Sequence, residues 1–88
     1  MKINEGFELR EMCGEHIIIA YGEKNINFSK VIALNESAAC IWRAVTGKDF
    51  TAEDMAAILC GEYEVSHEQA LEDCIRIAEE WQELGLCS

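Results

Sequence analysis

The sequence predicts an α+β domain in which a three-stranded antiparallel sheet is followed by three helices. The chain has 88 residues and no proline, and natural domains average about 100–150 residues, so we expect residues 1–88 to form a single domain. The pattern of apolar residues changes near Asn35, from signals typical of strands and turns to the spacing of capped helices. No linker, repeat or low-complexity segment divides the chain.

The strand signals come first. Residues 7–12, with apolar Phe7, Leu9 and Met12, favour a short first strand, and residues 13–15 favour a turn. Residues 16–21 are rich in β-branched side chains and give the strongest strand signal of the chain. A second turn is expected at residues 22–25 and a third strand within residues 26–34. So small a sheet needs a helical layer against one face to be stable.

Capping residues and glycines indicate where the first two predicted helices begin and end. Asn35 is a good N-cap for the first helix, and Gly47 is a natural stop. Thr51 and Asp54 resemble a capping box for the second helix, which we expect to end at Gly61. The expected apolar stripes are Ala38, Ile41, Trp42 and Val45 in the first helix and Ala52, Met55, Ala56 and Leu59, with Ile58 beside them, in the second.

The third predicted helix is the longest. Ser66 and Gln69 form a capping-box pattern, the helix runs from His67 to about Leu84, and Gly85 ends it. Its stripe comprises Ala70, Leu71, Cys74, Ile77, Ala78, Trp81 and Leu84. Ile75 lies to one side of this stripe and either widens the core contact or lines a surface groove. We expect one core that contains Ile41, Trp42, Met55, Leu59, Ile77 and Trp81.

Charge excludes several classes of partner. Seventeen acidic residues against seven basic ones give a net charge of −10, which opposes binding to nucleic acid and to anionic lipid. The longest apolar run, residues 17–21, is far shorter than the roughly 18 residues that a membrane helix needs. Without a secretion signal, a cytoplasmic protein is expected.

The residue types of catalysis do not form a recognisable site. The five cysteines include no Cys-x-x-Cys pair, and neither His16 nor His67 has a metal-site partner at the usual spacing. We therefore expect no metal, no cofactor and no catalytic residue. Cys40, Cys60 and Cys74 are expected to be core residues, whereas Cys13 and Cys87 are expected in an exposed turn and tail. The carboxylates along the last helix indicate a solvated face or a surface for a basic partner.

Three strands followed by three helices is also the layout of a winged helix-turn-helix domain. This layout leaves a transcriptional regulator as an alternative, although the charge opposes DNA binding. A small carrier or enzyme subunit is a second alternative. It is weakened because no serine lies in the Asp-Ser-Leu site of acyl carrier proteins and no nucleophile or metal site is evident.

Four motifs, in order, carry a family resemblance. They are Val-Ile-Ala-Leu-Asn-Glu-Ser-Ala-Ala-Cys-Ile-Trp at 31–42, Thr-Ala-Glu-Asp-Met at 51–55, Glu-Tyr-Glu-Val-Ser at 62–66, and Ile77-Ala78 with Trp81 and Gly85-Leu86. Together they resemble the D protein of pyrroloquinoline quinone biosynthesis and its relatives, over about residues 14–87. The chain differs in its strong acidity and in Trp81, where the family usually has a smaller aliphatic residue, so a product other than the quinone is expected.

The resemblance implies a non-catalytic, cofactor-free module that recognises precursor peptides. Such a domain binds the leader of a ribosomally made precursor and presents it to a modifying enzyme, often a radical S-adenosylmethionine protein. Either a monomer or a homodimer is compatible with this role.

A candidate site follows from the sheet. The third strand is last in the meander and should expose an unpaired edge, which can accept a peptide as an added strand. The resemblance places the leader between this strand and the last helix. The expected strand residues, acting mainly through their backbone, are Ser29, Lys30, Val31, Ile32 and Ala33. The expected helix residues are Leu71, Ile75, Ala78 and Gln82 as an apolar wall, with Glu79 at the rim.

Overall fold

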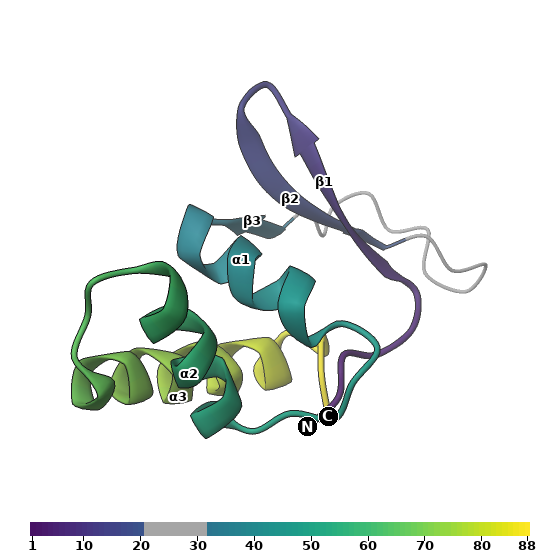
Figure 1. Ribbon diagram of the computed structural model, residues 1–88. Coiled ribbons are helices and arrows are strands. Elements are labelled where there is room, and N and C mark those ends of the chain that lie inside the picture. The colour runs from purple at the N-terminus through teal and green to yellow at the C-terminus, as the bar shows by residue number, and fades with distance from the viewer. Residues whose placement is uncertain (21–31) are drawn as a thin grey trace.

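The computed structural model describes residues 1–20 and 32–88 and confirms the predicted architecture. A three-stranded antiparallel sheet with the order β1-β2-β3 precedes three helices (Figure 1). The elements are β1 Phe7–Met12, β2 Glu15–Ala20, β3 Ile32–Leu34, α1 Glu36–Val45, α2 Ala52–Glu62 and α3 His67–Glu83. The part of the predicted third strand that precedes Ile32 lies outside the described residues, as does the second predicted turn.

The β1–β2 hairpin is closed by a two-residue turn. Cys13 and Gly14 both have positive φ angles, 54° and 79°, as a type I′ turn requires. This turn type matches the right-handed twist of the flanking strands and sets their register. On the other side of β2, Ile18 pairs with Ile32 and His16 with Leu34. Among the described residues β3 pairs only with β2, so one of its edges is free.

The first two helices begin at their predicted caps. The Asn35 side-chain oxygen accepts a hydrogen bond from the Ala38 amide at 2.8 Å. At α2, the Thr51 hydroxyl accepts from the Asp54 amide at 3.2 Å, and the Asp54 carboxylate accepts from the Thr51 amide at 2.9 Å, which completes the capping box. The predicted end at Gly61 is wrong, because α2 continues through it to Glu62. A lone glycine weakens a helix by about 1 kcal/mol without breaking it.

Helix α3 has the expected bounds but only half of the expected capping box. The Ser66 hydroxyl accepts from the Gln69 amide at 3.2 Å. The Gln69 side chain points along the helix and donates to Asp73 Oδ1 at 3.1 Å, so it does not return to the cap. At the other end, Gly85 has a φ of 77°, and this left-handed conformation stops the helix.

The core lies where the three helices meet the inner face of the sheet. Helix α1 lies between the sheet and the α2–α3 pair (Figure 1). The rings of Trp42 and Trp81 meet edge to face, with centroids 5.3 Å apart and an interplanar angle of 79°. Five of the six predicted core residues belong to the buried cluster, and the sixth, Ile77, is partly buried and packs against it.

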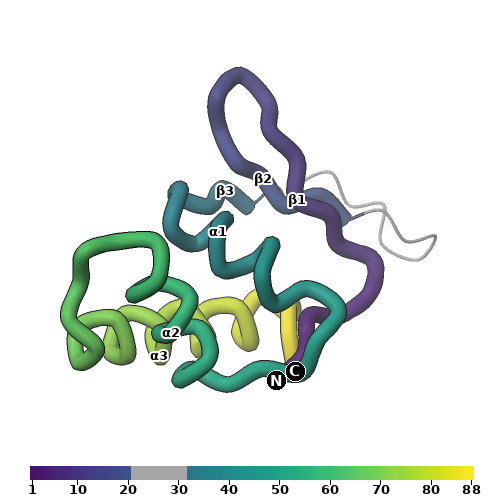
Figure 2. The backbone as a smooth tube through the Cα atoms, in the orientation of Figure 1, coloured from purple at the N-terminus to yellow at the C-terminus, as the bar shows by residue number. Residues whose placement is uncertain are grey.

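The two ends of the described chain lie side by side, a feature that periodicity did not predict (Figure 2). Lys2 and Ser88 exchange backbone hydrogen bonds of 3.0 and 3.1 Å, and Ile3 forms a bridge with Cys87. The expectation that Cys87 lies in an exposed tail is therefore wrong. Its side chain is buried in the core together with Ile3 and Leu86, because these bridges hold both terminal segments against it.

None of the helices among the described residues combines the length and the apolar character needed to cross a membrane.

Candidate functional site

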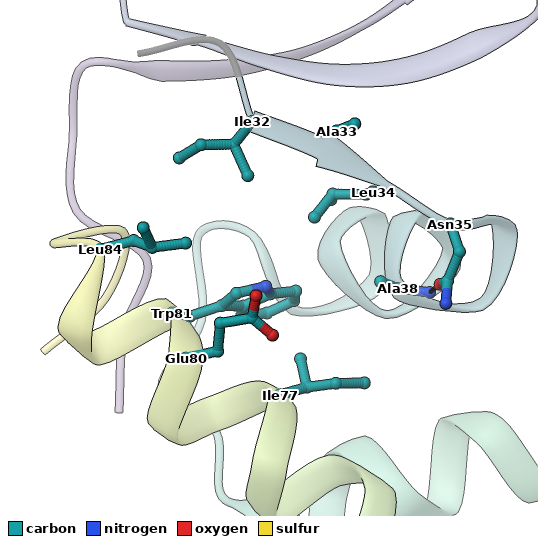
Figure 3. A pocket seen from close by; sticks show the side chains of 9 residues that line it. All are labelled: Ile32, Ala33, Leu34, Asn35, Ala38, Ile77, Glu80, Trp81 and Leu84. Atoms are coloured by element: carbon teal, nitrogen blue, oxygen red, sulfur yellow. Dashed lines mark hydrogen bonds between the residues drawn. The ribbon is translucent and has the colours of Figure 1, made fainter.

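A hollow of about 330 Å³ separates the free edge of β3 from helix α3 (Figure 3). We call it the β3–α3 groove. Its lining residues are Ile32, Ala33, Leu34, Asn35, Ala38, Ile77, Glu80, Trp81 and Leu84. Because β3 ends directly before the α1 cap, the described part of the strand, the cap and the first turn of α1 form one wall, and α3 forms the other.

The groove is apolar at its base and acidic on one side. The side chains of Ile32 and Leu34 point toward α3, whereas Ala33 points away, as strand alternation requires (Figure 3). Trp81 and Glu80, both from α3, line the same space (Figure 3). Trp81 is only 2 % exposed and is therefore fixed in place by the core.

Leu84 is an exposed large apolar side chain at the groove. Its exposed fraction is 44 %, although it sits beside partly buried Ile77 and Ile32. Covering an exposed apolar side chain at the rim of a hollow with a ligand removes apolar surface from water, which favours binding. The free strand edge supplies hydrogen-bonding groups, and the groove supplies apolar surface beside them.

A second hollow, of about 490 Å³, adjoins the first at the end of β3. It is lined by Gly14, Glu15, His16, Ala33, Leu34, Asn35 and Glu36, and it shares residues 33–35 with the β3–α3 groove. We call it the turn hollow. His16 connects the turn hollow to an ionic cluster. Glu11 Oε1 contacts His16 Nδ1 at 3.4 Å and Arg43 Nη2 at 3.3 Å. The guanidinium of Arg43 is thus already paired with a carboxylate.

Two of the five predicted strand residues lie within the described part of the chain. Ile32 and Ala33 line the groove. Ser29, Lys30 and Val31 lie outside the described residues.

The helix half is not placed as expected. Leu71 and Ile75 line a separate shallow hollow with Glu68 and Glu72, and none of the predicted helix residues lines the β3–α3 groove. Ala78 is buried in the core, and Glu79 and Gln82 are exposed. The structure therefore does not bring these helix residues together with Ile32 and Ala33 in one hollow.

The physical reason is the choice of helix edge. The apolar stripe of α3 has two margins, and the sequence prediction took the margin with Leu71 and Ile75, because Ile75 lies well away from the stripe's centre. The margin that faces β3 carries Ile77 and Leu84, which periodicity assigned to the core. Only the position of β3 distinguishes the margins, and sequence periodicity does not contain it. Ile75 itself is 44 % exposed, so it does line a surface hollow and does not widen the core.

Among the described residues, two thiols and one phenol outside these hollows have shifted pKa values. The pKa of the Cys74 thiol is raised to about 11, mainly by burial and to a smaller extent by the neighbouring Asp73 and Cys60. Burial also raises the pKa of Cys87, with a smaller opposing effect of the positive amino group at residue 1. The pKa of Tyr63 is raised by desolvation and by Glu36. Within residues 1–20 and 32–88, no three His, Cys, Asp or Glu side chains gather as metal ligands.

Comparison with protein families decides the family. The model of coenzyme PQQ synthesis protein D (PqqD) matches residues 15–86, which is most of the chain. This chain belongs to the PqqD family. The match agrees closely with the range of about 14–87 over which the sequence motifs resemble that family.

A solved structure shares the fold of this PqqD-family chain. It is TbiB1 in complex with the TbiA(β) leader peptide, with a TM-score of 0.76 and 16 % sequence identity. The similarity covers 100 % of this chain and 95 % of the TbiB1 chain. No curated protein matches the sequence significantly.

Proposed function

We propose that this chain binds the leader segment of a ribosomally made precursor peptide and presents it to a modifying enzyme of the radical S-adenosylmethionine type. The observation that carries the proposal is the free edge of β3 beside an apolar groove. Membership of the PqqD family supports it, as does the shared fold with TbiB1, a protein that itself holds a leader peptide.

The leader is held as a fourth strand of the sheet. Its backbone pairs with the free edge of β3, and every second side chain enters the β3–α3 groove. There, Trp81 and Leu34 form the base and Leu84 closes over the bound residue. Backbone pairing supplies affinity for any extended segment, whereas the apolar groove selects side chains.

The chain acts by bringing two molecules together and does no chemistry of its own. A surface with a net charge of −10 accelerates encounter with an enzyme surface that bears lysine and arginine. The same charge disfavours the transcriptional regulator that the layout allows, because DNA binding needs basic groups at the phosphates.

Two variants on one helix test the site of binding. Leu84 lines the β3–α3 groove and Ile75 lines the hollow beside Leu71, yet both side chains are 44 % exposed. Leu84→Asp and Ile75→Asp therefore introduce the same charge at equal exposure, and both should spare folding. We expect Leu84→Asp to weaken binding by about 1–3 kcal/mol, the range for an interface anchor, and Ile75→Asp to have little effect.

The measurement is a titration of a fluorescently labelled precursor peptide, to be sought among the short genes that neighbour the gene of this chain, into each folded variant. If Ile75→Asp lost affinity and Leu84→Asp did not, the earlier prediction of Leu71 and Ile75 as the peptide wall would replace the groove. A wild-type protein that binds no such peptide would refute the function itself.

A further inference from the structure

The charged side chains that the described residues contribute to the lining of the two adjoining hollows share one sign. Glu80 lines the β3–α3 groove, and Glu15 and Glu36 line the turn hollow. Among residues 1–20 and 32–88, neither set of lining residues includes a lysine or an arginine. Among the described residues, none of these three carboxylates forms an ion pair, whereas Arg10, Arg43 and Arg76 are each paired with another carboxylate.

From this pattern we infer that the leader peptide carries a lysine or arginine at the position that passes Glu80, and that Glu80 determines this preference. The inference rests on the proposed function and deepens it, because it names the chemistry of the peptide. The occupant is an extended segment in which apolar residues enter the groove and a basic residue lies at its rim.

The position of Glu80 explains why its charge would select a ligand. It is one helical turn from both Ile77 and Leu84, between the two apolar side chains of the α3 wall. A strand laid on β3 would cover this part of the wall and remove water from the carboxylate. A charge that loses water without gaining a partner costs free energy, so an apolar or acidic residue at this position is penalised.

A lysine or arginine removes that penalty. Its aliphatic stem can pack along Leu84 while its charged end reaches the Glu80 carboxylate. The carboxylates of Glu15 and Glu36 extend the negative potential past the end of β3. A peptide that continues beyond Leu34 therefore meets a second region that favours positive charge.

The net charge of −10 attracts any basic peptide, so the test must separate location from overall charge. Glu79 provides the matched control. It is exposed like Glu80 and adjacent on the same helix, but it does not line the groove. Glu80→Gln and Glu79→Gln change the net charge equally, and neither removes an ion pair among the described residues.

The probe is a displayed library of random twelve-residue peptides, selected on the wild-type chain and then counter-selected on Leu84→Asp. Retained sequences should be enriched in lysine or arginine at one fixed position relative to their apolar residues. The best of these peptides should bind Glu80→Gln about tenfold more weakly, the low end for one close charge pair at an interface. Glu79→Gln should change its affinity by less than about twofold.

A charge swap completes the test. Replacing the basic residue of the selected peptide by glutamate should abolish binding to the wild type and restore it to Glu80→Lys. Groove-dependent peptides without the basic residue, or an equal loss in Glu79→Gln and Glu80→Gln, would overturn the inference and leave the proposed function standing. If no selected peptide depended on Leu84, the proposed function would fail, and the inference with it.

Discussion

Trp42→Ala tests the packing of helix α1, which contacts the sheet, against helix α3, which forms one wall of the β3–α3 groove. The Trp42 side chain is 3 % exposed and meets the Trp81 ring edge to face at 5.3 Å. Truncating a buried tryptophan to alanine costs about 3–5 kcal/mol, and that range includes any loss of the aromatic pair, worth about 0.5–1.5 kcal/mol. A chain of 88 residues has a total stability of roughly 4–13 kcal/mol.

The substitution should therefore remove a large part of the free energy of unfolding of the domain. In a domain of this size, each 1 kcal/mol lowers the thermal midpoint by about 4–8 °C, so the midpoint should fall by at least about 12 °C. Far-ultraviolet circular dichroism is the assay, because it does not depend on the removed indole. Trp42→Phe keeps an aromatic edge against Trp81 and should lose much less. A midpoint within a few degrees of wild type in Trp42→Ala would refute the core assignment.

Two further predictions concern charge and protonation. Association with the modifying enzyme should slow as the salt concentration rises, because screening weakens the attraction between a domain of net charge −10 and a basic surface. Stopped-flow mixing measures the association rate. A rate that does not depend on salt would mean that the acidic face does not steer the encounter. The free energy of unfolding should fall as pH rises from about 9 toward about 11, because the Cys74 thiol releases its proton near pH 9.0 in the unfolded chain and near pH 11 in the folded one. Urea unfolding at a series of pH values should show this loss in the wild type. An equal loss in Cys74→Ala would exclude Cys74 as its source.

Sequence reasoning reached most of the fold because local signals and tertiary structure agree. The caps at Asn35, Thr51 and Ser66 are each satisfied by a backbone amide of the first turn. A capping residue followed by an apolar stripe specifies where a helix starts and which side it buries, before any long-range contact is known.

The failures concern contacts between segments distant in sequence. Cys87 is buried because Ile3 pairs beside it, and no local pattern indicates that the two ends of the described chain meet. The wall of the groove was missed for the same reason. Ile77 and Leu84 continue the core stripe in sequence, and only the approach of β3 turns that margin into a binding surface.

The edge strand was predicted because it depends on topology alone. Three consecutive strands in a meander leave the last one at an edge, and Ile32 and Ala33 follow from that order. A strand edge could thus be inferred from the sequence, whereas the helix face opposite it could not.

The central claim is that a leader peptide adds to the free edge of β3 and fills the groove beside α3. The most direct measurement is a two-dimensional ¹⁵N–¹H nuclear magnetic resonance titration of the labelled chain with the precursor's leader peptide. The account predicts the largest shifts at the amides of Ile32–Leu34 and at the indole N–H of Trp81, with small shifts at Leu71 and Ile75. Shifts concentrated at Leu71 and Ile75, with β3 and the Trp81 indole unmoved, would contradict it.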